Sequence, residues 1–236
     1  LTSLDLTSNT NLTYLYCREN QLVNLDVDNI STLDQLHCHD NQLTSIDLTS
    51  NVALTFLTCQ NNQLTTLDLS SNTALTLLYC GNNQLTSLNV SSNTALTYLA
   101  CQDNQLDSLD VSANTALTFL NVEGSNQLTS LDLSANTALT ELFCYNNELT
   151  SLDVSSNTEL TELNCSDNQL IALDVSSNTA LTNLYCSDNQ LTSLDVSANT
   201  SLQNLDCDVN NITELDVTNN PLLTGLGLFD CQINNI

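Results

Sequence analysis

The feature that most constrains this chain of 236 residues is a 21-residue unit repeated along almost its whole length. The unit reads L-x-x-L-x-C-x-x-N-Q-L-x-x-L-D-V-S-x-N-x-x and contains two similar halves. A fixed period of this length is typical of a solenoid, in which each coil buries its apolar residues against neighbouring coils. The repeats begin at Leu12, Leu33, Leu54, Leu75, Leu96, Leu117, Leu139, Leu160, Leu181, Leu202 and Leu223.

The repeats predict one domain over residues 1–236, with about ten full units, a half-repeat at the N-terminus and an irregular last repeat. The chain begins in mid-repeat without methionine, so we expect a fragment of a larger protein. In each half, apolar residues alternate with polar ones, which is the period of a β-strand. The sequence therefore predicts right-handed coils of parallel strands, with two short strands per repeat, weak curvature and little or no helix.

Asparagine is expected to turn the chain at two corners of each coil, since an amide can bond both the turn and the next coil. Ile30 interrupts the second asparagine ladder, and Cys231 takes the asparagine position of the last unit. Cysteine recurs every 21 residues at an inward position that Val122 and Leu228 also occupy, so we expect free, buried thiols rather than bridges or metal ligands. The first ladder comprises Asn20, Asn41, Asn62, Asn83, Asn104, Asn126, Asn147, Asn168, Asn189 and Asn210. The second comprises Asn9, Asn51, Asn72, Asn93, Asn114, Asn136, Asn157, Asn178, Asn199 and Asn220.

The segment from Leu54 to Leu64 resembles the leucine-rich-repeat signature L-x-x-L-x-L-x-x-N-x-L. The doubled 21-residue form, with cysteine at the third apolar position, resembles the bacterial nested-repeat class called IRREKO. This resemblance implies a β-rich leucine-rich-repeat solenoid. It also implies an internalin-like adhesion protein that is extracellular or on the bacterial cell surface.

The charge is one-sided, with 27 acidic residues against the single Arg18 and a formal net charge of −26. Nucleic acid and anionic membrane need a basic face, so neither is expected as a partner. A row of aspartates recurs in the second half-repeats, where hydrogen bonds to neighbouring Ser and Thr are favoured. Calcium is the alternative ligand of this row, but a flat row supplies too few oxygens for it, so no cofactor is predicted. The row is Asp26, Asp47, Asp68, Asp110, Asp132, Asp153, Asp174, Asp195 and Asp216.

Two outward positions of the first half-repeat vary between coils and carry eight of the ten aromatic residues. Exposed rings supply contact area at low entropy cost, so these positions predict a binding face for a protein or polysaccharide partner. The alternative is that aromatic residues stack there because they favour strands. The predicted ligand-binding residues are Tyr14, Tyr16, Phe56, Tyr79, Tyr98, Phe119, Phe143 and Tyr185.

Catalytic chemistry has few candidates, and no catalytic or metal-binding residues are predicted. His37 and His39 could hold a surface metal with Glu19 and Asp40, but two histidines in one variable repeat is the simpler account. Glu141 and Glu162 occupy equivalent positions on consecutive coils, as a glycosidase pair would, yet a regular solenoid offers no cleft.

The sequence therefore favours a non-enzymatic interaction or adhesion module. A structural spacer or filament segment that associates end to end is the alternative, and a carbohydrate-active enzyme is least favoured. The insertion at residues 121–126 is expected to form a bulge and a local hot region near Phe119, Glu141, Phe143 and Tyr145.

Overall fold

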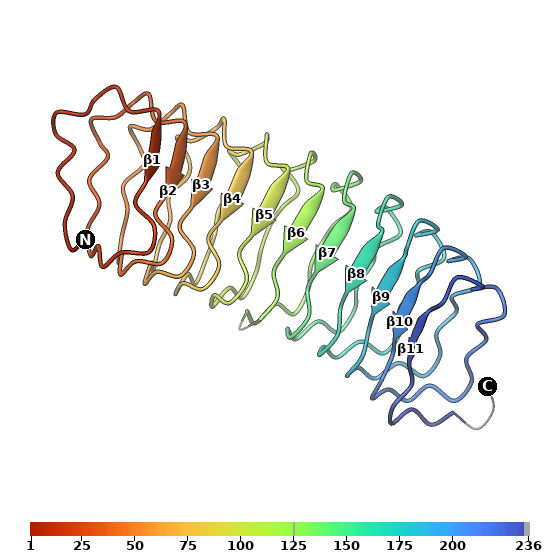
Figure 1. Cartoon of the computed structure of the whole chain (residues 1–236). Coiled ribbons are helices and arrows are strands. Elements are labelled where there is room, and N and C mark those ends of the chain that lie inside the picture. Colours follow the sequence, from red (N-terminus) through yellow and green to blue (C-terminus); the bar gives the residue numbers. More distant parts are fainter. Residues whose placement is uncertain (125, 234–236) are drawn as a thin grey trace.

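The computed structural model describes residues 1–124 and 126–233, which wind into an elongated, weakly curved stack of coils (Figure 1). Each coil contributes one strand to a single parallel sheet, and the strands lie in sequence order from β1 to β11. The described residues form no helix that could cross a membrane. The strands are β1 (Tyr14–Tyr16), β2 (Gln35–His37), β3 (Phe56–Thr58), β4 (Leu77–Tyr79), β5 (Tyr98–Ala100), β6 (Phe119–Asn121), β7 (Glu141–Phe143), β8 (Glu162–Asn164), β9 (Asn183–Tyr185), β10 (Asn204–Asp206) and β11 (Gly225–Gly227).

A leucine at the centre of each strand from β1 to β10 is buried in the core and sets the register of the sheet, whereas Leu226 of β11 is exposed at the last coil. Leu36 of β2 aligns with Leu15 of β1 and with Leu57 of β3. The residues on either side of this leucine point outward, because side chains alternate along a strand. A coil cannot cover its own leucines, so the core depends on stacking between neighbours.

The prediction of two strands per repeat is wrong, because only the first half of each described repeat forms a strand. Between second halves the described backbone makes one hydrogen bond per coil, for example from Gln42 N to Leu22 O at 2.9 Å. Near the end of the second half, N–H groups bond locally: Thr49 N donates to the Asp47 carboxylate, and Asn51 N donates to Leu48 O. The alternating side chains therefore lie on an extended backbone that does not pair with the next coil as β-strands do.

The cysteines form a buried column beside the leucines, and all ten are free. Nine are buried, while Cys231 is half-buried at the last coil. Burial raises the pKa of the Cys59 thiol to about 12, which keeps it protonated and unreactive. Val122 is fully buried in the sixth coil, where it replaces cysteine, which agrees with the prediction that this position needs only a small apolar side chain.

The first asparagine ladder closes the corner after each strand, as predicted. Asn41 Nδ2 donates to Cys38 O of its own coil and to Cys17 O of the preceding one, at 3.1 and 3.0 Å. Its Oδ1 accepts a hydrogen bond from Leu22 N at 3.0 Å. In the last coil the Cys231 thiol takes over this role and donates to Cys207 O at 3.1 Å.

The second ladder closes the opposite corner and is buried from Asn51 to Asn220, whereas Asn9 at its start is exposed. Asn93 Nδ2 donates to Leu69 O and Asn72 O of the preceding coil, at 3.1 and 2.9 Å. Ile30 interrupts the ladder and yet keeps the same backbone turn, since Ile30 N donates to Val27 O and Leu33 N donates to Ile30 O. The turn itself is therefore a backbone feature, and the amides join one coil to the next.

The extra residue of the sixth coil lies in the turn after β6, so it does not bulge the strand. Leu120 of β6 remains aligned with Leu142 of β7. Gly124 turns the chain with a φ of +90°, and a Cβ there would overlap the Asp103 carboxylate, so only glycine fits. Ser125 lies outside the described residues.

Candidate binding face

Seven rings lie side by side on the outward face of the sheet, from β1 to β7. They come from the first and third positions of successive strands and contact one another without a gap. Their ring centroids are 3.9–5.9 Å apart from one ring to the next. We call this set the aromatic row, which comprises Tyr16, His37, Phe56, Tyr79, Tyr98, Phe119 and Phe143.

Several rings of the aromatic row stack face to face. Tyr98 and Phe119 are 3.9 Å apart with an interplanar angle of 3°, and Tyr79 stacks on Tyr98 at 4.6 Å. Burial and a hydrogen bond with Tyr79 raise the pKa of the Tyr98 hydroxyl well above its usual range. In these stacked pairs the facing ring surfaces cover each other, so the paired rings present mainly their edges and hydroxyl groups to solvent.

The row contains six of the eight residues that the sequence singled out. Tyr14 is exposed at the first position of β1, and Tyr185 stands in β9 between Asn164 and Asp206, so neither joins the row. His37 was missed as a member, although it occupies the same third strand position as Tyr16. This shared strand position is the sequence feature that could have identified His37 as a member of the row.

The outward face changes from aromatic to polar at β7. Phe119 of β6 aligns with Glu141 of β7, and Glu141 aligns with Glu162 of β8, which confirms that these glutamates are neighbours. The polar ladder then continues through Asn183 and Asn204. Asn204 Nδ2 donates to Asn183 Oδ1 at 2.9 Å, and Asn183 Nδ2 donates to Glu162 Oε2 at 3.4 Å.

A solved structure shares the coil of this chain and, by its description, a column of cysteines. The functional domain of InlJ from Listeria monocytogenes, described as including a cysteine ladder, is 41% identical and superposes with a TM-score of 0.95. The chain is a leucine-rich-repeat solenoid. The match covers 96% of this solenoid and 51% of the InlJ chain, so the solenoid spans about half the length of that protein.

More distant structures share the leucine-rich-repeat fold alone. The leucine-rich-repeat protein LIC12759 of Leptospira interrogans is 23% identical with a TM-score of 0.84, over 100% of this chain and 71% of that one. The internalin InlF of Listeria monocytogenes is 22% identical with a TM-score of 0.65, over 95% and 83% of the two chains. A family described as the LVIVD repeat matches residues 86–122, which is less than two coils. No curated protein sequence matches the chain.

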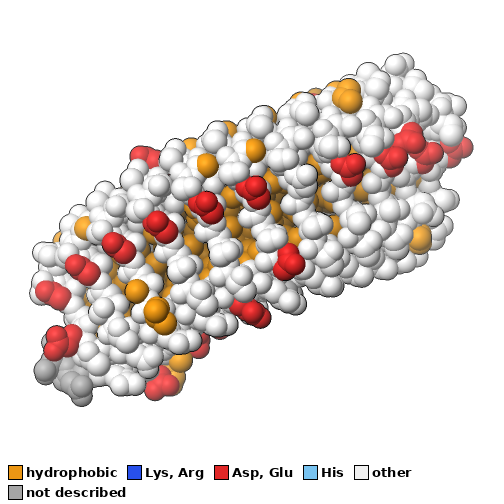
Figure 2. Space-filling model, turned by 180° about the vertical axis from the view of Figure 1, so that it is seen from behind, with side chains coloured by type: hydrophobic (Ala, Val, Ile, Leu, Met, Phe, Trp, Pro, Cys, Tyr) orange, Lys and Arg blue, Asp and Glu red, His pale blue; other side chains and the backbone are white. Residues whose placement is uncertain are grey.

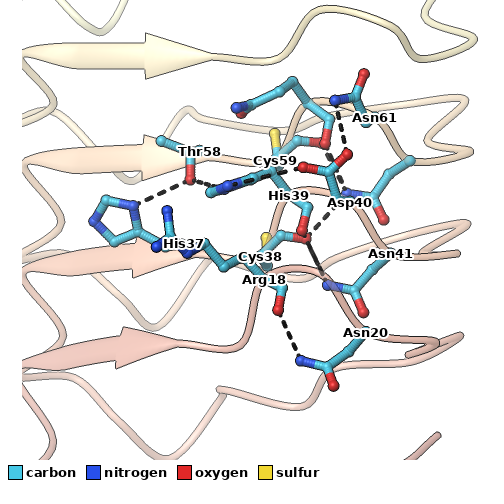
Figure 3. Close-up of polar contacts among 12 residues, drawn as sticks. Arg18, Asn20, His37, Cys38, His39, Asp40, Asn41, Thr58, Cys59 and Asn61 are labelled. Atoms are coloured by element: carbon cyan, nitrogen blue, oxygen red, sulfur yellow. Dashed lines mark hydrogen bonds and ion pairs between the residues drawn. The ribbon is translucent and has the colours of Figure 1, made fainter. Parts of the chain in front are cut away.

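Two histidines of the leucine-rich-repeat solenoid converge on one hydroxyl at the N-terminal end of the aromatic row (Figure 3). Thr58 Oγ1 lies 2.8 Å from His39 Nδ1 and 3.3 Å from His37 Nδ1. His39 Nε2 lies 3.9 Å from the Asp40 carboxylate. Although this grouping resembles an activated hydroxyl, Thr58 is only 5% exposed, so no substrate reaches it. Its role is to hold the two imidazoles in place.

His37 is the member of this cluster that also belongs to the aromatic row. Its ring stacks on Tyr16 at 4.4 Å, and its Nε2 atom is buried without a hydrogen-bond partner. Burial lowers the pKa of His37, and the nearby His39 and Arg18 lower it further. Among the described residues, no group of three His, Cys, Asp or Glu side chains is arranged to hold a metal ion.

The aspartate row of the second half-repeats caps turns in the leucine-rich-repeat coils. Asp47 Oδ1 accepts hydrogen bonds from the N–H and hydroxyl of Thr49, at 2.9 and 2.7 Å, which confirms the predicted pairing with Ser and Thr. These bonds lower the pKa of Asp47. Asn89 caps Ser91 in the same way without a charge. The cap therefore needs an acceptor oxygen and does not need a negative charge.

Acidic side chains follow a line along the face opposite to that of Figure 1, beside a band of hydrophobic side chains (Figure 2). This face is nearly uniform from coil to coil, whereas the outward face of the sheet varies. We take the uniform face as scaffold and the outward face of the sheet as the candidate site.

Proposed function

We propose that the solenoid is a non-enzymatic binding module that uses the aromatic row to contact a protein, outside the cell or on a bacterial cell surface. The observation that carries this proposal is the row itself, seven rings in contact across seven strands. Other large apolar side chains of the regular coils are mostly buried. A continuous set of outward rings is the chemistry that protein interfaces enrich.

The stacking of the rings favours a protein over a polysaccharide. Sugar rings bind aromatic side chains by lying flat on an open ring face. In the Tyr98–Phe119 pair, at 3.9 Å and 3°, the facing surfaces are already covered. Edges and hydroxyl groups instead suit the side chains and backbone of a protein.

Relatives support the same class of function and the same location. The InlJ structure that is 41% identical to this chain is the functional domain of InlJ, and the internalin InlF has the same fold. The solenoid covers about half of the InlJ chain, so we infer the partner of the solenoid from the residues on the outward face of its own sheet.

The test is a binding screen against arrayed cell-surface proteins and glycans, with a Tyr79→Ala/Tyr98→Ala double variant beside the parent chain. Saturable binding to a protein that is lost in this variant supports the proposal. An Ile171→Ala variant is the matched control, because Ile171 is an exposed apolar residue outside the strands. Equal binding by parent and double variant, at equal thermal stability, would remove the aromatic row as the site and bring the spacer function forward.

A further inference from the structure

The outward face of the sheet carries aromatic side chains from β1 to β7 and a ladder of carboxylate and amide side chains from β7 to β10. The two parts adjoin at β7. Phe119 and Phe143 are 5.5 Å apart at the end of the aromatic row, and Glu141 is aligned with Phe119 in the same strand as Phe143. Glu141 and Glu162 then continue the face. A partner that covers the last rings of the row must therefore also approach these carboxylates.

The chain has almost no cation with which to neutralise them. Its single Arg18 and both histidines lie near β1 and β2, at the other end of the row, and it has no lysine. In the described part of the chain the one ion pair joins His39 and Asp40, at 3.9 Å. Covering Glu141 and Glu162 with an apolar or acidic surface would strip water from unpaired charges, which is costly. A partner with basic residues supplies the missing cations.

The polar ladder also fixes where a cation would sit. Asn183 Nδ2 donates to Glu162 Oε2, and Asn204 Nδ2 in turn donates to Asn183 Oδ1. This chain of amides holds the Glu162 carboxylate on the sheet, with further acceptor positions free to bind a donor. Both glutamates are half-buried, so their charges are less screened than those of fully exposed side chains.

We infer that this face binds a protein segment in which apolar residues lie on the aromatic row and lysine or arginine residues reach Glu141 and Glu162. The inference rests on the proposed function and adds the chemistry and direction of the partner. Its basic part lies toward the C-terminal coils, and its apolar part lies toward β1. The contact with the glutamates weakens as salt is added, whereas the contact with the rings does not.

Synthetic peptides with a tryptophan–leucine block followed by an arginine block are the probe, and tryptophan fluorescence reports binding because the chain has no tryptophan. We expect this peptide to bind, and a peptide with serine in place of arginine to bind about ten-fold more weakly at low salt. A Glu141→Gln/Glu162→Gln variant should weaken binding of the arginine peptide by a similar factor and flatten its salt dependence. An Asp47→Asn/Asp68→Asn variant makes the same change of charge in the aspartate row and should bind like the parent.

Each other outcome has a definite meaning. Equal losses in the two charge variants would indicate general attraction to a polyanion and overturn the inference. Binding that depends on Tyr79 and Tyr98 but not on Glu141 and Glu162 would overturn it and leave the proposed function intact. Binding by the arginine peptide that ignores the tyrosines, or no binding at all, would count against both. Thermal unfolding of every variant separates these results from loss of the fold.

Discussion

At the scale of single residues, the turn after each strand depends on one backbone angle. The residue before the first-ladder asparagine has a positive φ in nearly every coil, a conformation that Asn and Asp tolerate better than other side chains. Four of these residues are aspartates, namely Asp40, Asp103, Asp167 and Asp188. The structure gives a local reason for Asp at these positions, because their φ values are between 50° and 56°.

Val209 is the costly exception to this pattern, since a β-branched residue holds a φ of +52° there. We expect Val209→Asn to raise the free energy of unfolding by about 1 kcal/mol, because it relieves left-handed strain. Urea denaturation measures the change. The reverse substitution, Asn146→Val, should destabilise by a similar amount, since Asn146 has the same conformation at 53°. A loss of stability in Val209→Asn would show that packing of the valine outweighs its strain.

At the scale of the coil, asparagine amides make hydrogen bonds between coils at corners where the backbone strands do not pair. The second half-repeats share one backbone hydrogen bond per coil, so the amides of the second ladder supply most of the polar contact at that corner. They also leave a row of buried Oδ1 atoms without a partner, Asn93 included. The stack therefore depends on the amide donors.

Replacement of one such amide should be severe. In Asn93→Ala, the buried carbonyls of Leu69 and Asn72 each lose one of two donors and keep the backbone hydrogen bond within their own turn, so each lost amide bond costs about 0.5–1.5 kcal/mol. We expect a loss of about 1–3 kcal/mol in the free energy of unfolding, measured by chemical denaturation. The control is Ser92→Ala, an exposed neighbour in the same turn, which should change stability little. Similar small effects in both variants would mean that the ladder is incidental.

The aromatic row, which crosses seven coils, contains one titratable imidazole. His37 has a lowered pKa in the folded chain, so folding favours its neutral form, and its contribution to stability is present above the ordinary pKa of 6.5. This contribution is lost as the pH falls below that value, because the unfolded chain then binds the proton more readily. His37→Phe removes the titration and keeps a ring in the row.

The difference in melting temperature between His37→Phe and the parent should therefore rise in favour of phenylalanine between about pH 7 and pH 5. Thermal unfolding followed by circular dichroism measures it. Tyr16→Phe is the control, because it retains the stacked pair with His37 and should keep the pH dependence of the parent. Parallel curves for parent and His37→Phe would show that the imidazole titrates normally.

The sequence predicted the coil well and its hydrogen bonding less well. Repeat spacing located the buried leucines, both asparagine ladders and the aspartate caps, because each depends on side-chain type at a fixed position. The second strand was wrong because alternation gives the direction of side chains, and whether backbone groups meet depends on the neighbouring coil. The aromatic row shows the same limit: its residues were predicted, but the stacking of Tyr98 on Phe119 depends on how two rows of side chains interleave.

At the scale of the whole molecule, charge opposes a fold that hydrogen bonds and the core stabilise. The formal net charge is −26, and acidic side chains follow a line along the stack (Figure 2). The described residues contain a single ion pair, His39–Asp40, so electrostatic attraction offsets little of this repulsion. An elongated shape spreads the charge, but aspartates on consecutive coils remain close enough to repel. The coulombic effect of Asp110 and Asp153 on Asp132 is an example.

Added salt should therefore stabilise this chain, in contrast to proteins whose surfaces are held by ion pairs. The Debye length falls from about 30 Å at 0.01 M to about 8 Å at 0.15 M, which screens repulsion between coils. We expect the melting temperature to rise over this range by about 2–4 °C for each kcal/mol of repulsion removed. Differential scanning calorimetry in sodium chloride measures the rise. A fall in melting temperature would reveal attractive pairs that outweigh the repulsion.

Calcium chloride at matched ionic strength provides a second comparison. Overlapping curves for the two salts would mean that screening alone acts on the aspartate row. An additional rise in melting temperature at low calcium concentration would mean that the row binds calcium.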